Sequence, residues 1–306
     1  MSQGKGWGLE LMDRVQNEGV VHHEVVDRLE QLTKRCTVAY FTFFGHPAGL
    51  ITDDDAALLE TVLRSVDLDQ HEGKLDLVLH SPGGSPTAAE KVILTCRSFA
   101  KDFRVVVPRS AMSAATLVCM GADALLMAET SEIGPIDPQM VIKLPGQDGV
   151  EMRPAAAFVA AYLDLIKRAQ EAIKAGEPPH PFIELLRRQD PVFVQMCLKA
   201  RDLARTIAVE YLGRYQLQGK PPDEIQRIAD TFLEEGEKGS HGRVIRGKKA
   251  QDYGLNVELA DKNGEQWRTV WELYMRCEHY VQTRRLAKYI VTSHGGLNVQ
   301  VQAIRL

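Results

Sequence analysis

Apolar positions in the first half of the chain follow two alternating spacings. Short runs of β-branched and aromatic residues, typical of buried strands, lie at 38–44, 75–80, 104–108 and 124–128. Between them, apolar residues recur at helical spacing over 86–101 and 113–121, and three aspartates after Thr52 mark the start of a further helix. This alternation predicts an α/β fold, with a parallel sheet covered by helices on both faces.

The second half of the chain is mainly helical in pattern. Helices are predicted over 155–175, 182–218 and 223–235, followed by a helix–strand unit at 247–257 and an amphipathic helix that carries Trp267 and Trp271. The tail, 287–306, is predicted as an extension with a strand that pairs with a neighbour. We therefore divide the chain into an N-terminal helical segment (1–36), a main domain (37–258) with a helical insertion at about 155–236, and a C-terminal helix and extension (259–306).

Composition narrows the classes of function. The 306 residues are 44% apolar and carry a formal net charge of −4, which gives no reason to expect nucleic acid as a partner. No run of eighteen apolar residues occurs, so we expect a cytoplasmic protein, with attachment to a membrane surface left open. Cys96 and Cys119 lie in apolar helical patterns, which predicts buried reduced thiols. No metal-ligand cluster is apparent, and we expect no metal and no cofactor.

Two segments carry the candidate chemistry. They read LDLVLHSPGGSP (75–86) and VVVPRSAMSAATLVCMGAD (105–123), and each predicts a strand, a tight turn and a helix. Ser113 stands where the second helix begins. The backbone N–H groups of Gly83 and Gly84 in the first turn could face a developing oxyanion. Together the two segments indicate an acyl-transfer site.

These motifs, with ADALLMAETSEIGPIDPQ and GRVIRGKKAQDYGL further along, resemble the Clp-fold serine peptidases over about residues 37–258. That superfamily includes the proteolytic subunit of the Clp protease and signal peptide peptidase A, and the chain is most similar to the serine dehydrogenase proteinase family. The resemblance implies a Clp/crotonase-like spiral of ββα units and a mainly helical C-terminal part. It also implies a peptide or protein substrate held as an added strand, and a ring-forming homo-oligomer.

The resemblance gives roles to individual residues. Ser113 would be the nucleophile, and Ser110, which lies nearby, falls outside the register of the motif. Gly84, with the N–H group of Ala114, would hold the oxyanion, while Gly83 would shape the turn or contribute a second donor. The alternative role for Ser113 is a helix N-cap that satisfies free backbone donors.

The general base is left open between two residues. The chain has no histidine between His80 and His180, so the histidine of the Clp subunit has no counterpart. Lys167 could serve as a desolvated lysine base, as in signal peptide peptidases. His241 lies beside Gly242, where the Clp subunit has its triad aspartate, so its imidazole would lack that orienting carboxylate.

The leading hypothesis is therefore a serine peptidase, and two alternatives stay open. One is a catalytically inactive assembly or adaptor module, in which the tryptophans of the C-terminal helix contact a partner. The other is a crotonase-like acyl-CoA enzyme, which would need a pocket for an adenine nucleotide.

Overall fold

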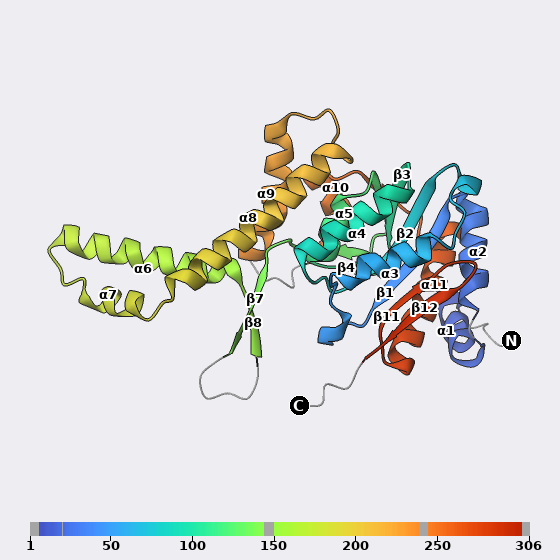
Figure 1. Cartoon of the computed structure of the whole chain (residues 1–306), viewed down its shortest axis with the longest axis horizontal. Coiled ribbons are helices and arrows are strands. Elements are labelled where there is room, and N and C mark those ends of the chain that lie inside the picture. The colour runs from blue at the N-terminus through green and yellow to red at the C-terminus, as the bar shows by residue number, and fades with distance from the viewer. Residues whose placement is uncertain (1–5, 20, 144–149, 239–243, 302–306) are drawn as a thin grey trace.

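A seven-stranded sheet forms the centre of the molecule. The computed structural model describes residues 6–19, 21–143, 150–238 and 244–301 (Figure 1). In spatial order the sheet contains β10 (Val257–Leu259), β5 (Ala124–Met127), β3 (Asp102–Val107), β2 (Lys74–His80), β1 (Cys36–Thr42), β11 (Leu286–Val291) and β12 (Gly296–Gln300). The first five strands are parallel to one another. β11 runs antiparallel to β1, and β12 runs antiparallel to β11. The predicted α/β class, with its mainly parallel sheet, is confirmed.

Helices bury both faces of this sheet. One layer consists of α3 (Asp54–Leu63), α4 (Pro86–Phe99) and α5 (Ala114–Met120), and the other of α2 (His22–Thr33) and α11 (Glu265–Arg284). In β1, Val38 and Tyr40 join the first core, whereas Ala39 and Phe41 join the second. Residues 38–41 of β1 are therefore apolar without alternation, as expected for a strand covered on two sides.

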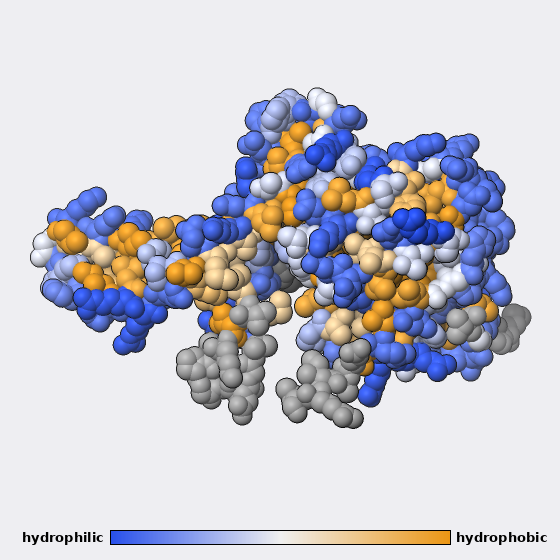
Figure 2. Space-filling model, viewed as in Figure 1, coloured by the Kyte–Doolittle hydropathy of each residue, from blue (hydrophilic) through white to orange (hydrophobic). Residues whose placement is uncertain are grey.

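A helical arm extends from the body. It begins with the hairpin of β7 (Gln139–Lys143) and β8 (Val150–Pro154) and continues through α6 (Ala155–Ala175), α7 (His180–Arg187) and α8 (Pro191–Arg214) (Figure 1). The predicted helix over 182–218 is two helices, because Asp190 caps α8 through the N–H of Val192 at 2.8 Å and Pro191 begins it. Apolar side chains gather on the surface of the arm (Figure 2).

The remaining helices return the chain to the body. The helix α9 (Pro222–Lys238) packs on α8, and α10 (Gly247–Tyr253) leads into β10. The N-terminal helix α1 (Trp7–Asn17) lies on α11. Among the described residues, no helix is both long and apolar enough to cross a membrane.

The C-terminal extension forms part of the central sheet. Its first strand, β11, pairs with β1 of the same chain, from Ala39 opposite Val291 to Thr42 opposite Lys288. The neighbour expected for this strand is thus the first strand of the chain itself. All five cysteines are buried and free, as predicted for Cys96 and Cys119.

Candidate active site

The turns that follow β2 and β3 are held together by backbone pairing. Ser81 donates its N–H to the carbonyl of Ser110 at 3.1 Å, and Met112 donates to the carbonyl of Ser81 at 2.9 Å. The short strand β4 (Ser110–Ala111) also pairs with β6 (Glu132–Ile133), which pairs with β9 (Ile245–Arg246). The two motifs that carry the candidate chemistry therefore lie side by side.

Ser113 occupies a strained junction between β4 and α5. Its backbone has φ 53° and ψ −117°, a conformation that a residue with a Cβ rarely adopts. Ser113 stands at the N-cap of α5, yet its hydroxyl makes no cap hydrogen bond. Ser85 differs, because at the N-cap of α4 its Oγ accepts the N–H of Ala88 at 3.4 Å. The hydroxyl of Ser113 is half-buried and is not used for capping, so the alternative N-cap role is wrong.

Gly83 allows this close approach. A Cβ at Gly83 would lie 2.8 Å from the Cβ of Ser113 and 2.4 Å from the carbonyl oxygen of Met112, and its φ is +98°. Both the contact and the backbone conformation exclude a side chain here. The glycine is therefore needed to place the first turn against the serine.

The backbone N–H of Gly84 points away from the segment of the chain that pairs with it. Ile51 donates its N–H to the carbonyl of Gly83 at 2.8 Å and accepts the N–H of Ser85 at 3.0 Å. In such a bridge the residue between the two bonded positions presents its own N–H on the opposite side. The Gly84 N–H therefore points away from Ile51, and both Gly84 and Ala114, the first residue of α5, line the cleft. These are the donors that the sequence predicted for an oxyanion.

Both turns line a cleft of about 330 Å³. Gly84, Ser113 and Ala114 form one part of its wall, and apolar side chains form much of the rest: Leu50, Ile51, Leu117, Ile136 and Met152. None of the described residues that line this cleft carries a charge. The cleft can therefore hold an apolar side chain next to the serine hydroxyl.

Thr116 is a supporting residue that the sequence analysis missed. Its fully buried hydroxyl lies 2.9 Å from the carbonyl oxygen of Ala111 and 3.0 Å from that of Gly134, and it accepts the N–H of Gly134 at 3.0 Å. It therefore joins β4, α5 and the segment after β6 around Ser113. A polar residue inside an otherwise apolar helix, three positions after the serine, is the signal that could have identified it.

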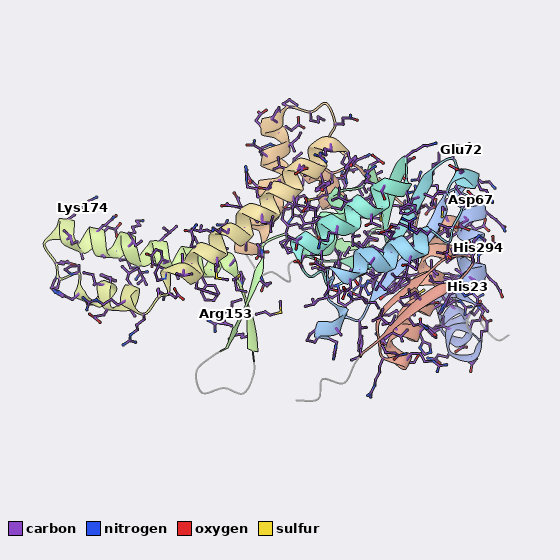
Figure 3. All side chains as sticks on the ribbon, in the orientation of Figure 1. His23, Asp67, Glu72, Arg153, Lys174 and His294 are labelled. Atoms are coloured by element: carbon purple, nitrogen blue, oxygen red, sulfur yellow. The ribbon has the colours of Figure 1, made fainter. Side chains whose placement is uncertain are left out.

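The structure does not bring Lys167 to Ser113 within the chain. The helix α6 begins at the cleft, where Ala155 donates to Pro138, and Lys167 lies about 18 Å further along its axis. Its side chain is 73% exposed and pairs with Glu171 at 3.8 Å, so the desolvation that a lysine base needs is absent. Figure 3 shows Lys174 near the outer end of the same helix, while Arg153 lies on the hairpin at its base.

His241 lies outside the described residues. The described chain on either side of 239–243 contacts the segment 132–136, which leads from β6 to the cleft. On one side, Phe232 of α9 accepts the N–H of Ile136 at 3.1 Å, and on the other, Ile245 pairs with Ile133. No lysine or histidine is among the described residues that line the cleft.

His80 has a structural environment. Its ring stacks on Phe44 with centroids 4.4 Å apart, and its Nδ1 lies 3.0 Å from the carbonyl oxygen of Ser110. Burial lowers the pKa of His80 to about 3 and raises the pKa of Glu278, whose Oε2 lies 3.6 Å from Nε2. Burial therefore favours the neutral form of both groups. His80 therefore supports the turn rather than lining the cleft.

Comparison with known proteins is consistent with this geometry. Residues 29–157 match the sequence model of a family described as ClpP-like SDH-type serine proteinase. This segment contains both turns, the nucleophile candidate and the strands β1, β2, β3 and β5. The resemblance that the motifs indicated is confirmed for this part of the chain.

Individual relatives cover similar portions. Two uncharacterized proteins of Methanocaldococcus jannaschii are 31% identical over 134 residues and 34% identical over 122 residues, which is 41% and 40% of this chain. The matched regions are 45% and 37% of those relatives, so the chain spans less than half of their length. Among solved structures, a mutant of a membrane-bound stomatin-specific protease aligns with 44% of this chain. The alignment covers 63% of the protease chain, with 17% sequence identity and a TM-score of 0.29.

Proposed function

We propose that this chain is a serine peptidase with Ser113 as its nucleophile, because residues 29–157 match the sequence model of the ClpP-like SDH-type serine proteinases. The observation that carries the proposal is the conformation of Ser113. A serine with positive φ at a strand–helix junction, with an uncapped hydroxyl in a cleft beside two amides, is the arrangement of an exposed nucleophile.

The proposed reaction is acyl transfer through a covalent intermediate. Ser113 Oγ forms a bond to the carbonyl carbon of the peptide, its proton passes to the base, and the carbonyl electrons move to oxygen. The N–H groups of Gly84 and Ala114 stabilise that oxyanion, and the positive end of α5 adds to their effect. The intermediate then expels the amine, which takes the proton from the base. Water then attacks the carbonyl carbon of the acyl-enzyme and gives its proton to the base. The bond to Ser113 Oγ breaks, Oγ regains the proton, and the acid is released.

We assign the base to His241. This assignment is supported by the two described anchors of its segment: Phe232 bonds to Ile136, which lines the cleft, and Ile245 pairs with Ile133, three residues before it. It is supported further by the exposed position of Lys167, the other candidate. An imidazole has an intrinsic pKa suited to proton transfer near neutral pH.

The lining of the cleft suggests which peptides are cleaved. Its side chains near Ser113 are apolar, and a charged residue would lose its hydration there without gaining a partner. We therefore propose cleavage next to apolar residues. Peptides that differ only by leucine or glutamate before the scissile bond test this preference.

The decisive variant is Ser113→Ala, with Ser110→Ala as its matched control three residues earlier. We expect Ser113→Ala to lower peptide hydrolysis by at least about a thousandfold, because the nucleophile is removed. Ser110→Ala should keep most of the activity, since the Ser110 hydroxyl makes a single 3.5 Å contact with Glu132 among the described residues, and the backbone pairing of Ser110 is retained. Unchanged hydrolysis by purified Ser113→Ala protein would exclude the proposed nucleophile.

A fluorophosphonate probe separates an active peptidase from the inactive adaptor module. The probe should label wild-type protein and Ser110→Ala, but not Ser113→Ala, because only an activated serine reacts. His241→Ala should lose labelling, and Lys167→Ala should retain it. Wild-type protein that stays unlabelled would favour the adaptor function.

A further inference from the structure

A second cavity, of about 300 Å³, is formed by the first residue of α1, the first half of α11 and the loops that follow β3, β5 and β10. It is lined by all three tryptophans of the chain and by three cationic side chains: Trp7, Trp267, Trp271, Arg109, Lys262 and Arg268. The helix α11 covers the face of the sheet opposite α5. This cavity is therefore separate from the cleft at Ser113.

The three indole rings provide the apolar lining of this cavity, and they differ in how far they are exposed to solvent. Trp267 is buried at 5% exposure and forms the floor, Trp271 is half-buried, and Trp7 is 37% exposed. Trp271 also contacts Tyr274, with ring centroids 5.0 Å apart. Large aromatic rings left partly exposed around a hollow favour binding of an apolar group in it.

The cationic groups at this wall are only partly neutralised. Lys262 pairs with Glu129 at 3.4 Å, and both side chains are largely exposed, so solvent screens the pair. Arg109 lies 3.8 Å from Glu132 and donates to the carbonyl of Thr130 at 3.2 Å.

Arg268 has the greatest capacity for an anion. Its guanidinium lies over the Trp7 ring, 5.6 Å from the centroid, and it has no carboxylate partner within the part of the chain that the structure describes. A planar guanidinium held against an indole presents several donors for a carboxylate.

We propose that this cavity binds a carboxylate attached to an aromatic body. The aromatic part would lie against Trp267 and Trp271, and the carboxylate would accept hydrogen bonds from Arg268, with Lys262 and Arg109 adding positive potential. The three cations oppose a positively charged ligand, although indole rings alone would attract one. Both a free aromatic acid and the C-terminal residue of a polypeptide have this chemistry.

Intrinsic fluorescence gives a direct measurement, because all three tryptophans line the cavity. Three probes share a phenylpropyl body and differ in charge: 3-phenylpropanoate, 3-phenylpropanamide and 3-phenylpropylammonium. Titration of the full chain, excited at a wavelength that only indole absorbs, should show the carboxylate binding at least about tenfold more tightly than the amide. The ammonium should bind most weakly. Equal affinities for the three probes would refute a charge-selective site.

The variant Arg268→Gln tests the role of the guanidinium. Its matched control is Arg284→Gln, because Arg284 is exposed on the same helix and lies 6.0 Å from the centroid of the Tyr280 ring, outside the cavity. We expect Arg268→Gln to weaken 3-phenylpropanoate binding about tenfold and to leave 3-phenylpropanamide unchanged, whereas Arg284→Gln alters neither. Equal effects of the two variants would exclude Arg268 as the anion ligand.

A fourth probe identifies the source of the ligand. N-acetyl-glycyl-glycyl-phenylalanine presents the same terminal group on a polypeptide main chain. If it binds more tightly than 3-phenylpropanoate, the site is one for a polypeptide C-terminus, and if it binds more weakly, the site is one for a free aromatic acid. Failure of both to bind would overturn the proposal. Hydrolysis by Ser113 is not part of this measurement, so the two proposals can fail separately.

Discussion

At the scale of single residues, the site depends on a strained serine and on the groups that hold it. The positive φ of Ser113 costs free energy, and it persists because backbone pairing fixes Met112 on one side and α5 begins on the other. Thr116 contributes the buried hydroxyl that joins these parts. The strain at the proposed nucleophile is thus stabilised by residues that lie outside the lining of the cleft, Met112 and Thr116.

The variant Thr116→Val measures this support. Valine has nearly the same shape, but it leaves the N–H of Gly134 and a carbonyl without their partner, so we expect a loss of about 1–3 kcal/mol in the free energy of unfolding. Peptide hydrolysis should fall as well, because the turn at Ser113 loosens. Urea unfolding and initial rates check the two effects.

The control for that variant is Thr61→Val. Thr61 is exposed on α3, and its hydroxyl also donates to a carbonyl, that of Ala57 at 2.8 Å. Its loss should have little effect, because water replaces the exposed bond. Similar losses at positions 61 and 116 would contradict the supporting role of Thr116.

At the scale of elements, the hydrophobic pattern predicted most of the fold because buried strands and amphipathic helices have distinct periods. The predicted helix over 155–175 matches α6, and Ser113 was correctly placed at the start of α5. The break at Asp190 was missed, although Asp before Pro is a strong helix-start signal. The hairpin of β7 and β8 was also missed. The position of Lys167 relative to Ser113 could not be predicted, because helical spacing in a sequence does not show in which direction a helix extends from the body.

The pairing of β11 with β1 was beyond local pattern, since it joins residues far apart in the sequence. It buries Lys288 beside Asp55, where the ammonium group bonds to the carboxylate and to Thr52 Oγ1, the latter at 2.9 Å. Thr52 lines the cleft. Lys288 of β11 therefore holds Thr52 in its place in the cleft wall.

The variant Lys288→Met should lower the free energy of unfolding by about 3–5 kcal/mol, because it leaves the fully buried Asp55 without its counter-charge. Chemical denaturation measures the loss. Lys91→Met is the matched control, since Lys91 pairs with the nearby Asp53 at 3.1 Å while both side chains are exposed. If both variants lower the free energy of unfolding by the same amount, burial does not make the Lys288–Asp55 pair more important for stability than the exposed Lys91–Asp53 pair.

At the scale of the whole molecule, buried histidines make stability depend on pH. Burial lowers the pKa of His22 to about 4, and that of His80 to about 3. Because the unfolded chain binds these protons near pH 6.5, the contribution of each neutral histidine is complete above that pH and is lost as the pH falls toward the folded value. The raised pKa of Glu278 acts in the opposite direction.

We expect the free energy of unfolding to fall between pH 6.5 and 5, with a slope of up to about 1.4 kcal/mol per pH unit for each histidine. His22→Gln should reduce that slope by up to about 1.4 kcal/mol per pH unit, since His22 bonds to Tyr289 at 2.8 Å, whereas Glu278 lies beside His80. Urea unfolding across this pH range measures the effect. Superimposable profiles for the variant and the wild type would contradict the assignment.

The arm gives the molecule an extended apolar surface. Its exposed side chains include Ile173 at 62% and Val192 at 66%. Since monomeric proteins rarely expose large contiguous apolar patches, we predict that copies of this chain cover the arm in a homo-oligomer. Light scattering after size exclusion should give a multiple of 34.1 kDa, the mass of one chain.

Substitution on the arm tests this prediction. Ile173→Glu combined with Val192→Glu should shift the protein toward the monomer, because the two carboxylates would be buried in the interface. Lys174→Gln, beside Ile173, should leave the assembly unchanged. A wild-type protein that elutes as a monomer would contradict the prediction.

The pairing of β11 with β1 also affects how the protein is made. During synthesis, β1 and the turn that carries Ser113 leave the ribosome long before residues 286–291 exist. Until then the edge of β1 that pairs with β11 has no partner strand, and Asp55 and Thr52 lack their bonds to Lys288. A nascent chain therefore cannot complete the wall of its cleft, and incomplete products would be released without an assembled site. The contacts of Lys288 form only after β11 has been synthesised, so this part of the cleft wall assembles later than the turns that carry Gly84 and Ser113.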